Sequence, residues 1–208
     1  MEGETGLRIL SVFFHPDPSV SAVGGAEKRV LESLKVFWKK GVGVTVVEPK
    51  PSLVGQLGTG YAAFELPVVS MSGRGGWLGI YVEWALWTLK ASIECLRLVS
   101  SREHHLVHAP NNTLPNLVPT YLAHLASRLP LCTVVHHIDS LSPEANQNFF
   151  AVYSMYRRIG YGRIVSLIKA SAFLLVLGVL KRSDACITVS GATAKALVRN
   201  GVPAGKVH

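Results

Sequence analysis

Short apolar runs rich in β-branched residues alternate with longer segments of helical spacing, and this alternation restricts the chain to few folds. A run that is apolar at nearly every position is typical of a strand buried on both faces of a parallel sheet. We predict strands over residues 7–14, 42–48, 66–70, 105–109, 131–136 and 184–189. We predict helices over residues 24–40, 77–100, 115–128, 149–182 and 191–200, the fourth interrupted near Gly160 and Gly162.

Repeated strand–helix–strand units form right-handed crossovers. The predicted fold class is therefore α/β, an open parallel sheet with helices on both faces, in one domain that covers residues 1–208. Such sheets bind ligands in the crevice outside the carboxyl ends of their strands. The loops to examine begin at His15, Pro110, His137 and Ser190, and polar residues gather in all of them.

Composition excludes several classes of protein. The chain has 208 residues, 49% of them hydrophobic and only 16% charged, which excludes intrinsic disorder. The cysteines are few, scattered and odd in number, which excludes a disulfide scaffold: Cys95, Cys132 and Cys186. The net charge of +8 together with a mean hydropathy of +0.31 leaves three interpretations open: a membrane span, a membrane-surface protein, or a polyanion-binding protein.

The sequence favours neither a signal peptide nor a transmembrane helix. Residues 1–8 carry Glu2 and Glu4, and the apolar stretch over residues 9–14 is too short for a signal peptide. The strongest apolar run, residues 170–180, falls short of the ~20 residues that a span needs. We therefore favour a buried or interfacial helix there. Without an export signal or a cysteine pattern, we expect a cytoplasmic protein.

The loop after the first strand ends in Gly24 and Gly25 at the start of a helix. Glycines let a phosphate approach the backbone, and a helix N-terminus offers unpaired N–H groups. Neither a G-x-G-x-x-G fingerprint nor a Walker A lysine is present. The pair therefore indicates either a phosphate-compatible loop of another kind or a plain strand–helix turn.

Histidines end the fifth predicted strand, where His136 and His137 precede Asp139. A histidine there can donate to a sugar hydroxyl or phosphate, or exchange protons near pH 7. Neighbouring residues of a strand point to opposite faces, so only one of the two faces a given site. The alternative for each is a structural side chain. His104, His105 and His108 do not form a recognisable metal pattern, and we expect no metal.

Two further polar groups have structural alternatives. Ser190 follows the last strand and suits either a helix N-cap, which we favour, or a ligand contact. No G-x-S-x-G elbow surrounds it, which argues against a serine hydrolase. Asn111 and Asn112 begin a formal glycosylation acceptor, for which we favour a turn-forming role.

Positive charge concentrates in residues 145–183, which hold six basic residues and no acidic one. Aromatic residues alternate with them, as is typical of a helix that lies in the headgroup region of a membrane. The candidate membrane surface comprises Arg157, Arg158, Arg163 and Lys169. The alternative is a core helix with solvated basic ends. Nucleic-acid binding would rest on net charge alone, since no motif supports it.

Four segments together resemble a known family. They are GGAEKRVLESLKVFWKKGVGVTVVEP, LVHAPNN, PLCTVVHHID and LKRSDACITVSGATAKALVRNGVPAGKVH. In order and spacing they are similar to the N-terminal domain of GT-B-type glycosyltransferases, in the large family four of retaining, nucleotide-sugar-dependent enzymes. The resemblance implies a Rossmann-like domain that binds the acceptor, with the nucleotide sugar in a cleft to a second domain. Residues 49–101 contribute little to it.

The resemblance also implies roles for particular residues. Gly24 and Gly25 match the loop near the donor diphosphate, and His137, with His136 as the alternative, matches the histidine near the transferred sugar. The remaining candidates for the acceptor site or cleft are His15, Asn111, Asn112, Asp139 and Ser190. The donor would be a nucleotide-diphosphate sugar, with no other cofactor and no metal.

One departure bears on activity. The family continues into an N-G-V-D segment and a C-terminal domain with diphosphate-binding basic residues and an E-x7-E motif, and residues 1–208 contain no match to these. We expect the isolated chain to be inactive as a hexosyltransferase, or active only with a partner chain that supplies the donor side. The acceptor could be a glycan or a lipid-linked sugar. A non-catalytic membrane-surface module is the alternative function.

Overall fold

The structure, a computed structural model, describes residues 6–15, 25–55, 61–68, 72–136, 138 and 148–208. The chain forms two compact units, Met1–Cys132 and Thr133–His208, and each is described by itself. The sheet has six strands in the order β3-β2-β1-β4-β5-β6. The strands are β1 (Arg8–Val12), β2 (Gly43–Pro49), β3 (Tyr61–Leu66), β4 (Leu106–Ala109), β5 (Leu131–Val135) and β6 (Ala185–Thr188). The predicted α/β class with a parallel sheet is confirmed.

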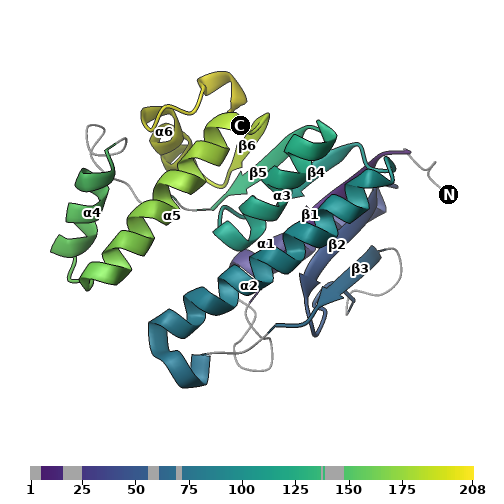
Figure 1. Cartoon of the computed structure of the whole chain (residues 1–208). Coiled ribbons are helices and arrows are strands. Elements are labelled where there is room, and N and C mark those ends of the chain that lie inside the picture. Colours follow the sequence, from purple (N-terminus) through teal and green to yellow (C-terminus); the bar gives the residue numbers. More distant parts are fainter. Residues whose placement is uncertain (1–5, 16–24, 56–60, 69–71, 137, 139–147) are drawn as a thin grey trace. The chain divides into compact units, whose positions relative to one another are not determined.

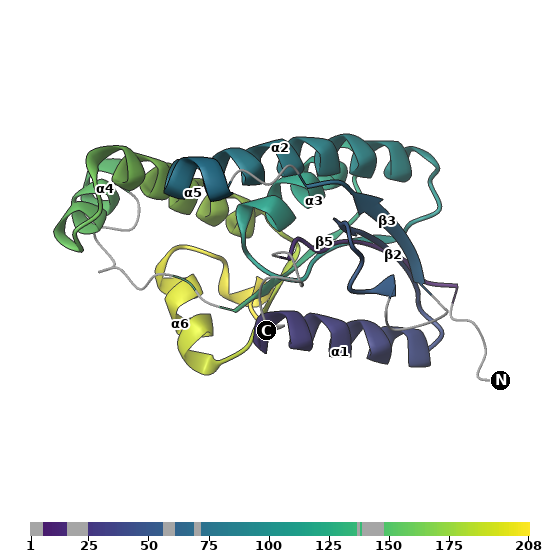
Figure 2. The same cartoon turned by 90° about the horizontal axis from the view of Figure 1, so that it is seen from below.

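The first unit has helices on both faces of its strands (Figure 2). Helix α1 (Gly25–Lys39) covers one face, while α2 (Ser72–Ser100) and α3 (Leu114–Ser127) cover the other. Beneath α1, Val30 and Leu34 pack with Val44 and Val46 of β2 in one buried cluster. The side chains alternate along β2 because successive residues of a strand face opposite sides, so one face of the strand meets α1.

The second unit holds helices α4 (Phe149–Arg158), α5 (Arg163–Arg182) and α6 (Gly191–Arg199) with strand β6. Figure 1 shows α4 and α5 side by side, joined by a short turn. Gly160 in this turn has φ +103°, a conformation that favours glycine. The interruption predicted near Gly160 and Gly162 is therefore confirmed.

Helix α5 forms the centre of the second unit's core. Its buried residues Ala170, Phe173, Leu177 and Leu180 recur at helical spacing. They pack with Val135, Val152, Tyr156, Cys186 and Leu197. Of the helices in the described ranges, α5 alone is long and apolar enough to cross a membrane, judged by length and composition, a test that core helices also pass.

Two predictions of secondary structure are wrong. The third strand is β3, Tyr61–Leu66, which ends where the predicted strand begins, and helix α2 begins at Ser72, before its predicted start at residue 77. Strand β3 stands last in the strand order and pairs with β2. An edge strand buries less of its surface, so its sequence lacks the continuous apolar run that marks the central strands. Pro67 follows directly and has no N–H for a ladder.

Candidate functional site

The carboxyl ends of three neighbouring strands meet at one edge of the first unit. Strand β1 pairs in parallel with β2 on one side and with β4 on the other. His15 follows β1, Glu48 lies near the end of β2, and Asn111 follows β4. Ligands bind at this edge in open α/β sheets, and these polar side chains are the ones that the fold places there.

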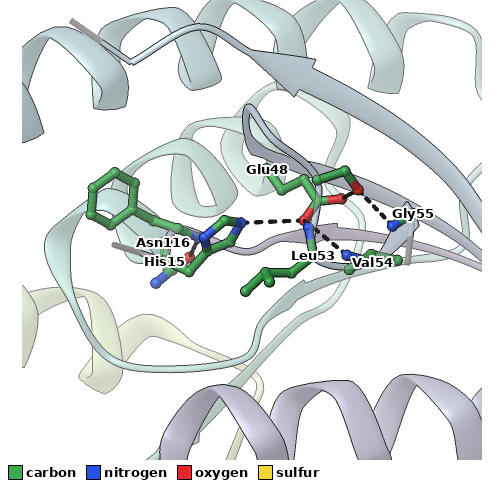
Figure 3. Close-up of polar contacts among 8 residues, drawn as sticks. His15, Glu48, Leu53, Val54, Gly55 and Asn116 are labelled. Atoms are coloured by element: carbon green, nitrogen blue, oxygen red, sulfur yellow. Dashed lines mark hydrogen bonds and ion pairs between the residues drawn. The ribbon is translucent and has the colours of Figure 1, made fainter. Parts of the chain in front are cut away.

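Glu48 is the centre of a buried network at this edge (Figure 3). Its Oε2 accepts the backbone N–H groups of Leu53 at 3.0 Å and Val54 at 3.2 Å. Its Oε1 accepts the hydroxyl of Ser52, whose Oγ in turn accepts the N–H of Gly55 at 2.6 Å. A fully buried carboxylate is costly unless hydrogen bonds and a counter-charge compensate for its lost hydration. The segment that carries these donors, residues 52–55, folds back over the end of β2 to supply them.

His15 is the other buried partner of this carboxylate. Its Nε2 lies 3.4 Å from Glu48 Oε2, and both side chains are fully buried. The N–H of Phe13 donates to the carbonyl of Val47 at 2.8 Å, which continues the β1–β2 ladder up to the histidine. The Phe13 ring lies 5.3 Å from the imidazole, centroid to centroid. The ladder, the ring and the carboxylate together fix where the imidazole lies.

Asn116 connects the β1 loop to the β4 loop. Its Oδ1 accepts the N–H of Phe14 at 2.6 Å, and its Nδ2 donates to Asn111 Oδ1 at 2.5 Å. Asn111 Oδ1 also accepts the N–H of Thr113 at 3.0 Å. Asn111 therefore shapes the turn before α3, and half-buried Asn112 lies beside it. Asn116 is fully buried, so this link rests on a side chain with most of its hydrogen-bonding capacity used within the protein.

The other predicted site residues fall in different places. Gly25 opens α1 and is exposed, and no described residue outside its own helix turn lies within 4 Å of where a Cβ would lie. Gly24, His137 and Asp139 lie outside the described residues. In the second unit, His136 follows β5 and is half-buried.

Ser190 has the structural role that we favoured. Its Oγ accepts the N–H of Thr193 at 3.1 Å and caps α6. The cap satisfies one of the unpaired N–H groups of the first turn of the helix.

Three further histidines of the first unit bond within the fold. His104 Nε2 lies 3.1 Å from Thr45 Oγ1, His105 Nδ1 accepts the N–H of Arg8 at 3.1 Å, and His108 Nδ1 lies 3.1 Å from Ser11 Oγ. Burial lowers the pKa of His104, and it lowers the pKa of His108 to about 4. Within the described ranges, no three His, Cys, Asp or Glu side chains group as metal ligands would. Burial also raises the pKa of the Cys95 thiol, which makes it a poor nucleophile.

A pocket of about 600 Å³ opens at the opposite edge of the first unit. Its lining includes Arg8, Trp38, Thr45, Glu103 and His104, which lie at the amino-terminal side of the strands. The carboxyl edge is the stronger candidate site, because open α/β sheets bind ligands there and because the buried hydrogen-bond network of Glu48 lies there.

The family follows from the sequence comparison. The model of Glycosyltransferase Family 4 matches residues 23–208, most of the chain. The chain belongs to Glycosyltransferase Family 4. The match confirms the similarity to this family that we inferred from four segments of the sequence. The comparison with curated proteins gives no match.

Solved structures resemble the Family 4 chain in fold. HepE from Anabaena, crystallised with UDP and glucose, is 18% identical with a TM-score of 0.52; the match covers 97% of this chain and 43% of that one. UGT2 from Phytolacca americana is 10% identical with a TM-score of 0.54, and the match covers 97% and 51%. MnaA from S. aureus, solved with UDP, is 15% identical with a TM-score of 0.51, and the match covers 97% and 42%. This chain thus spans about half the length of the structures it resembles, or less.

Sequence reasoning missed two residues of this edge. Glu48 was predicted only as the last residue of a strand, and Asn116 only as part of a helix. A signal for Glu48 was available, because a carboxylate directly after a continuous apolar run must find partners. The serine and the N–H groups of the following loop are such partners. The link from Asn116 to the β1 loop gave no local signal, since Phe14 is far away from it in the sequence.

Proposed function

We propose that this Family 4 chain is the acceptor-side domain of a retaining, nucleotide-sugar-dependent glycosyltransferase. The observation that carries the proposal is the buried His15–Glu48 pair beside Asn111 and Asn116, at the carboxyl ends of β1, β2 and β4. A site that orients sugar hydroxyls needs donors and acceptors held in fixed directions. This edge offers the half-buried side chains of Asn111 and Asn112, while His15, after β1, and Asn116, in the first turn of α3, are buried.

In this proposal each predicted residue keeps its stated role. His137, or His136 as the alternative, acts near the transferred sugar, and the loop of Gly24 and Gly25 approaches the donor diphosphate. His15, Asn111, Asn112, Asp139 and Ser190 border the acceptor or the cleft. Departure of the nucleotide diphosphate needs positive charge that stabilises the leaving phosphate. Residues 1–208 hold no match to the family's donor-side motifs, so we propose that the isolated chain does not transfer sugar.

The test is histidine NMR on the full chain labelled with ¹⁵N-histidine. We expect UDP-glucose and glucose at millimolar concentration to shift the resonances of His15 and of His136 or His137. Assignments come from single His→Asn variants, and exposed His105 at the amino-terminal side is the internal control. The same samples should release no UDP from UDP-glucose. Shifts confined to His105, or no shifts at all, would contradict the acceptor-side assignment, and UDP release would contradict inactivity.

We also propose peripheral contact with the inner face of the membrane, through a surface at the α4–α5 turn. The α4–α5 surface comprises Arg157, Arg158, Ile159, Arg163, Ile164 and Leu167. All six are exposed, with Ile159 at 63% and Ile164 at 69%. Exposed apolar side chains among cations are typical of surfaces that enter the headgroup region of anionic bilayers. Such contact would bring a lipid-linked acceptor to the domain.

Lys169, which we assigned to the membrane surface from the sequence, lies beside the α4–α5 surface and has a different role. It is half-buried, and its Nζ lies 4.7 Å from the centroid of the Tyr161 ring and 5.5 Å from that of Tyr156. Arg157 is exposed and donates to the carbonyl of Tyr161 at 2.5 Å. Lys169 therefore supports the turn through cation–π contacts, while the three arginines carry the exposed charge.

Vesicle binding tests the α4–α5 surface. We expect the chain to co-sediment with vesicles that contain phosphatidylglycerol and to bind pure phosphatidylcholine vesicles much more weakly. Each cation near an anionic surface contributes about 1 kcal/mol, so R157Q/R158Q/R163Q should weaken binding on the order of 100-fold. The matched control is K28Q/R29Q/K39Q, which removes three exposed charges from α1 and should have a small effect. Equal effects of the two triple variants, or equal binding to both vesicle types, would contradict this proposal.

A further inference from the structure

Helix α2 is apolar on two opposite faces. One face is buried in the first unit and carries Trp87, Ala91, Cys95 and Val99. The other face is exposed: Val82, Leu86, Leu89, Ile93 and Leu96, each between 38% and 62% exposed. A helix that is apolar all round is normally covered all round. The exposed set, named here the α2 seam, has no cover within the described residues of the first unit.

The spacing of the α2 seam is that of a helix–helix contact. The intervals between its residues run four, three, four and three, so the seam follows a heptad pattern over two heptads. At 100° per residue, these side chains fall in a stripe about 80° wide. A stripe this narrow and regular is typical of a seam between two helices, whereas a helix that packs on a broad core has a wider apolar face.

The charges beside the seam complement each other in one orientation only. Glu83, Lys90 and Arg97 follow seam positions at intervals of seven residues, all on one flank, while Ala85 and Ser92 occupy the other flank. A parallel pair would bring the charged flank against the partner's uncharged flank. An antiparallel pair brings the charged flank of each helix against that of the other, and Glu83 then lies across from the partner's Lys90. Arg97 is paired with Glu94 of its own helix at 2.5 Å, and Lys90 Nζ donates to the carbonyl of Pro67 at 3.1 Å. A carbonyl does not neutralise the ammonium, so Lys90 keeps its charge on this flank.

A lipid surface fits the α2 seam less well. The charged residues over residues 82–97 are two acidic and two basic, namely Glu83, Lys90, Glu94 and Arg97. Residues 82–97 therefore have no net charge to attract an anionic bilayer, unlike the α4–α5 surface. In addition, α2 is long enough to cross a membrane but not apolar enough, and among the described helices only α5 meets both conditions.

We propose that the α2 seam binds the α2 seam of a second copy of this chain, as an antiparallel two-helix interface. In this register Leu86 faces the partner's Leu89, and Val82 faces the partner's Ile93. The seam is about 21 Å long at 1.5 Å per residue. One helix pair of this length buries less than a large permanent interface, so the dimer is weak and forms at micromolar concentration or above.

Sedimentation of the full chain at about 5 to 200 μM tests the proposal, since this range brackets a micromolar dissociation constant. We expect a monomer–dimer equilibrium. Ile93→Glu places a charge in the seam and should weaken dimerisation at least about tenfold. The matched control is Ile164→Glu, which places the same charge at an equally exposed isoleucine of the α4–α5 surface and should leave dimerisation unchanged.

A charge swap tests the orientation. Glu83→Lys alone and Lys90→Glu alone should each weaken the dimer by about fivefold through like-charge contacts, and E83K/K90E should restore it to within about twofold. The proposal is overturned by a monomer at every concentration, by equal effects of Ile93→Glu and Ile164→Glu, or by failure of the double variant to recover. It is also overturned if Ile93→Glu abolishes binding to phosphatidylcholine vesicles, because lipid would then be the occupant.

Discussion

Glu48→Leu should lower the free energy of unfolding by about 3 to 5 kcal/mol, because it removes a buried carboxylate and leaves several buried hydrogen-bond donors without their acceptor. The leucine leaves the imidazole of His15, the hydroxyl of Ser52 and the N–H groups of Leu53 and Val54 without their carboxylate. Such a loss is a large fraction of the ~5 to 15 kcal/mol by which a domain of ordinary stability is folded. Urea unfolding at pH 7, followed by circular dichroism, measures it.

The matched control is the exposed ion pair Arg8–Glu103. Its N–O distance is 2.9 Å, shorter than that of the buried pair, but the two side chains are 58% and 61% exposed. Glu103→Gln should therefore cost at most about 1 kcal/mol. Glu48→Gln keeps the volume and one acceptor oxygen, so its cost in free energy of unfolding should lie between those of Glu48→Leu and Glu103→Gln. If Glu48→Leu costs no more than Glu103→Gln, the buried network does not stabilise the first unit.

Stability should fall by about 2 kcal/mol between pH 7 and pH 5 because of His108 alone. The pKa of this fully buried histidine is lowered from 6.5 to about 4 by desolvation. As the pH falls, His108 is therefore protonated near pH 6.5 in the unfolded chain but only near pH 4 in the folded chain. The neutral His108 contributes its full share of the free energy of unfolding above pH 6.5, and this share is lost as the pH falls from 6.5 to 4. His104, whose pKa is also lowered by burial, acts in the same direction.

The variant His108→Asn isolates this effect. Asparagine keeps a polar group near Ser11 Oγ but does not titrate in this range. The variant should be less stable at pH 7, and its stability should change less between pH 7 and pH 5 than that of the native chain. Urea unfolding at both pH values measures the difference. Parallel pH profiles for the two proteins would show that His108 titrates equally in the folded and unfolded states.

Burial on both faces determines how much of this fold can be predicted from sequence. Strands β1 and β2 are central and lose almost all contact with water, so their sequences are largely apolar. Both ends of each strand were predicted to within two residues. Strand β3 pairs with β2 and stands last in the strand order, and its sequence YAAFEL carries no such run. Its position follows from pairing with β2, which is a property of the folded chain.

The residues of the candidate site also differ in how well the sequence predicts them. His15 and Asn111 were predictable because they follow apolar runs directly, and the carboxyl ends of parallel strands share one edge. Asn116 was not, because folding brings its partner Phe14 to it from far away in the sequence. Glu48 was missed although its partners Ser52, Leu53 and Val54 follow it closely. Ser190 was predicted as a cap from its position before a helix, since capping is a local interaction.

Gly55 is an exposed residue whose neighbours leave no room for a side chain. A Cβ there would lie 2.8 Å from Ser52 Oγ, and that oxygen is held by its bonds to Glu48 and to the Gly55 N–H. To make room, the hydroxyl would have to leave the carboxylate that also holds His15. A single methyl group added at the surface would thus displace Ser52, weaken the hold on Glu48 and so disturb the buried imidazole of His15. Solvent exposure is therefore a poor guide to mutational tolerance here, and position 55 should be as restricted as a core position.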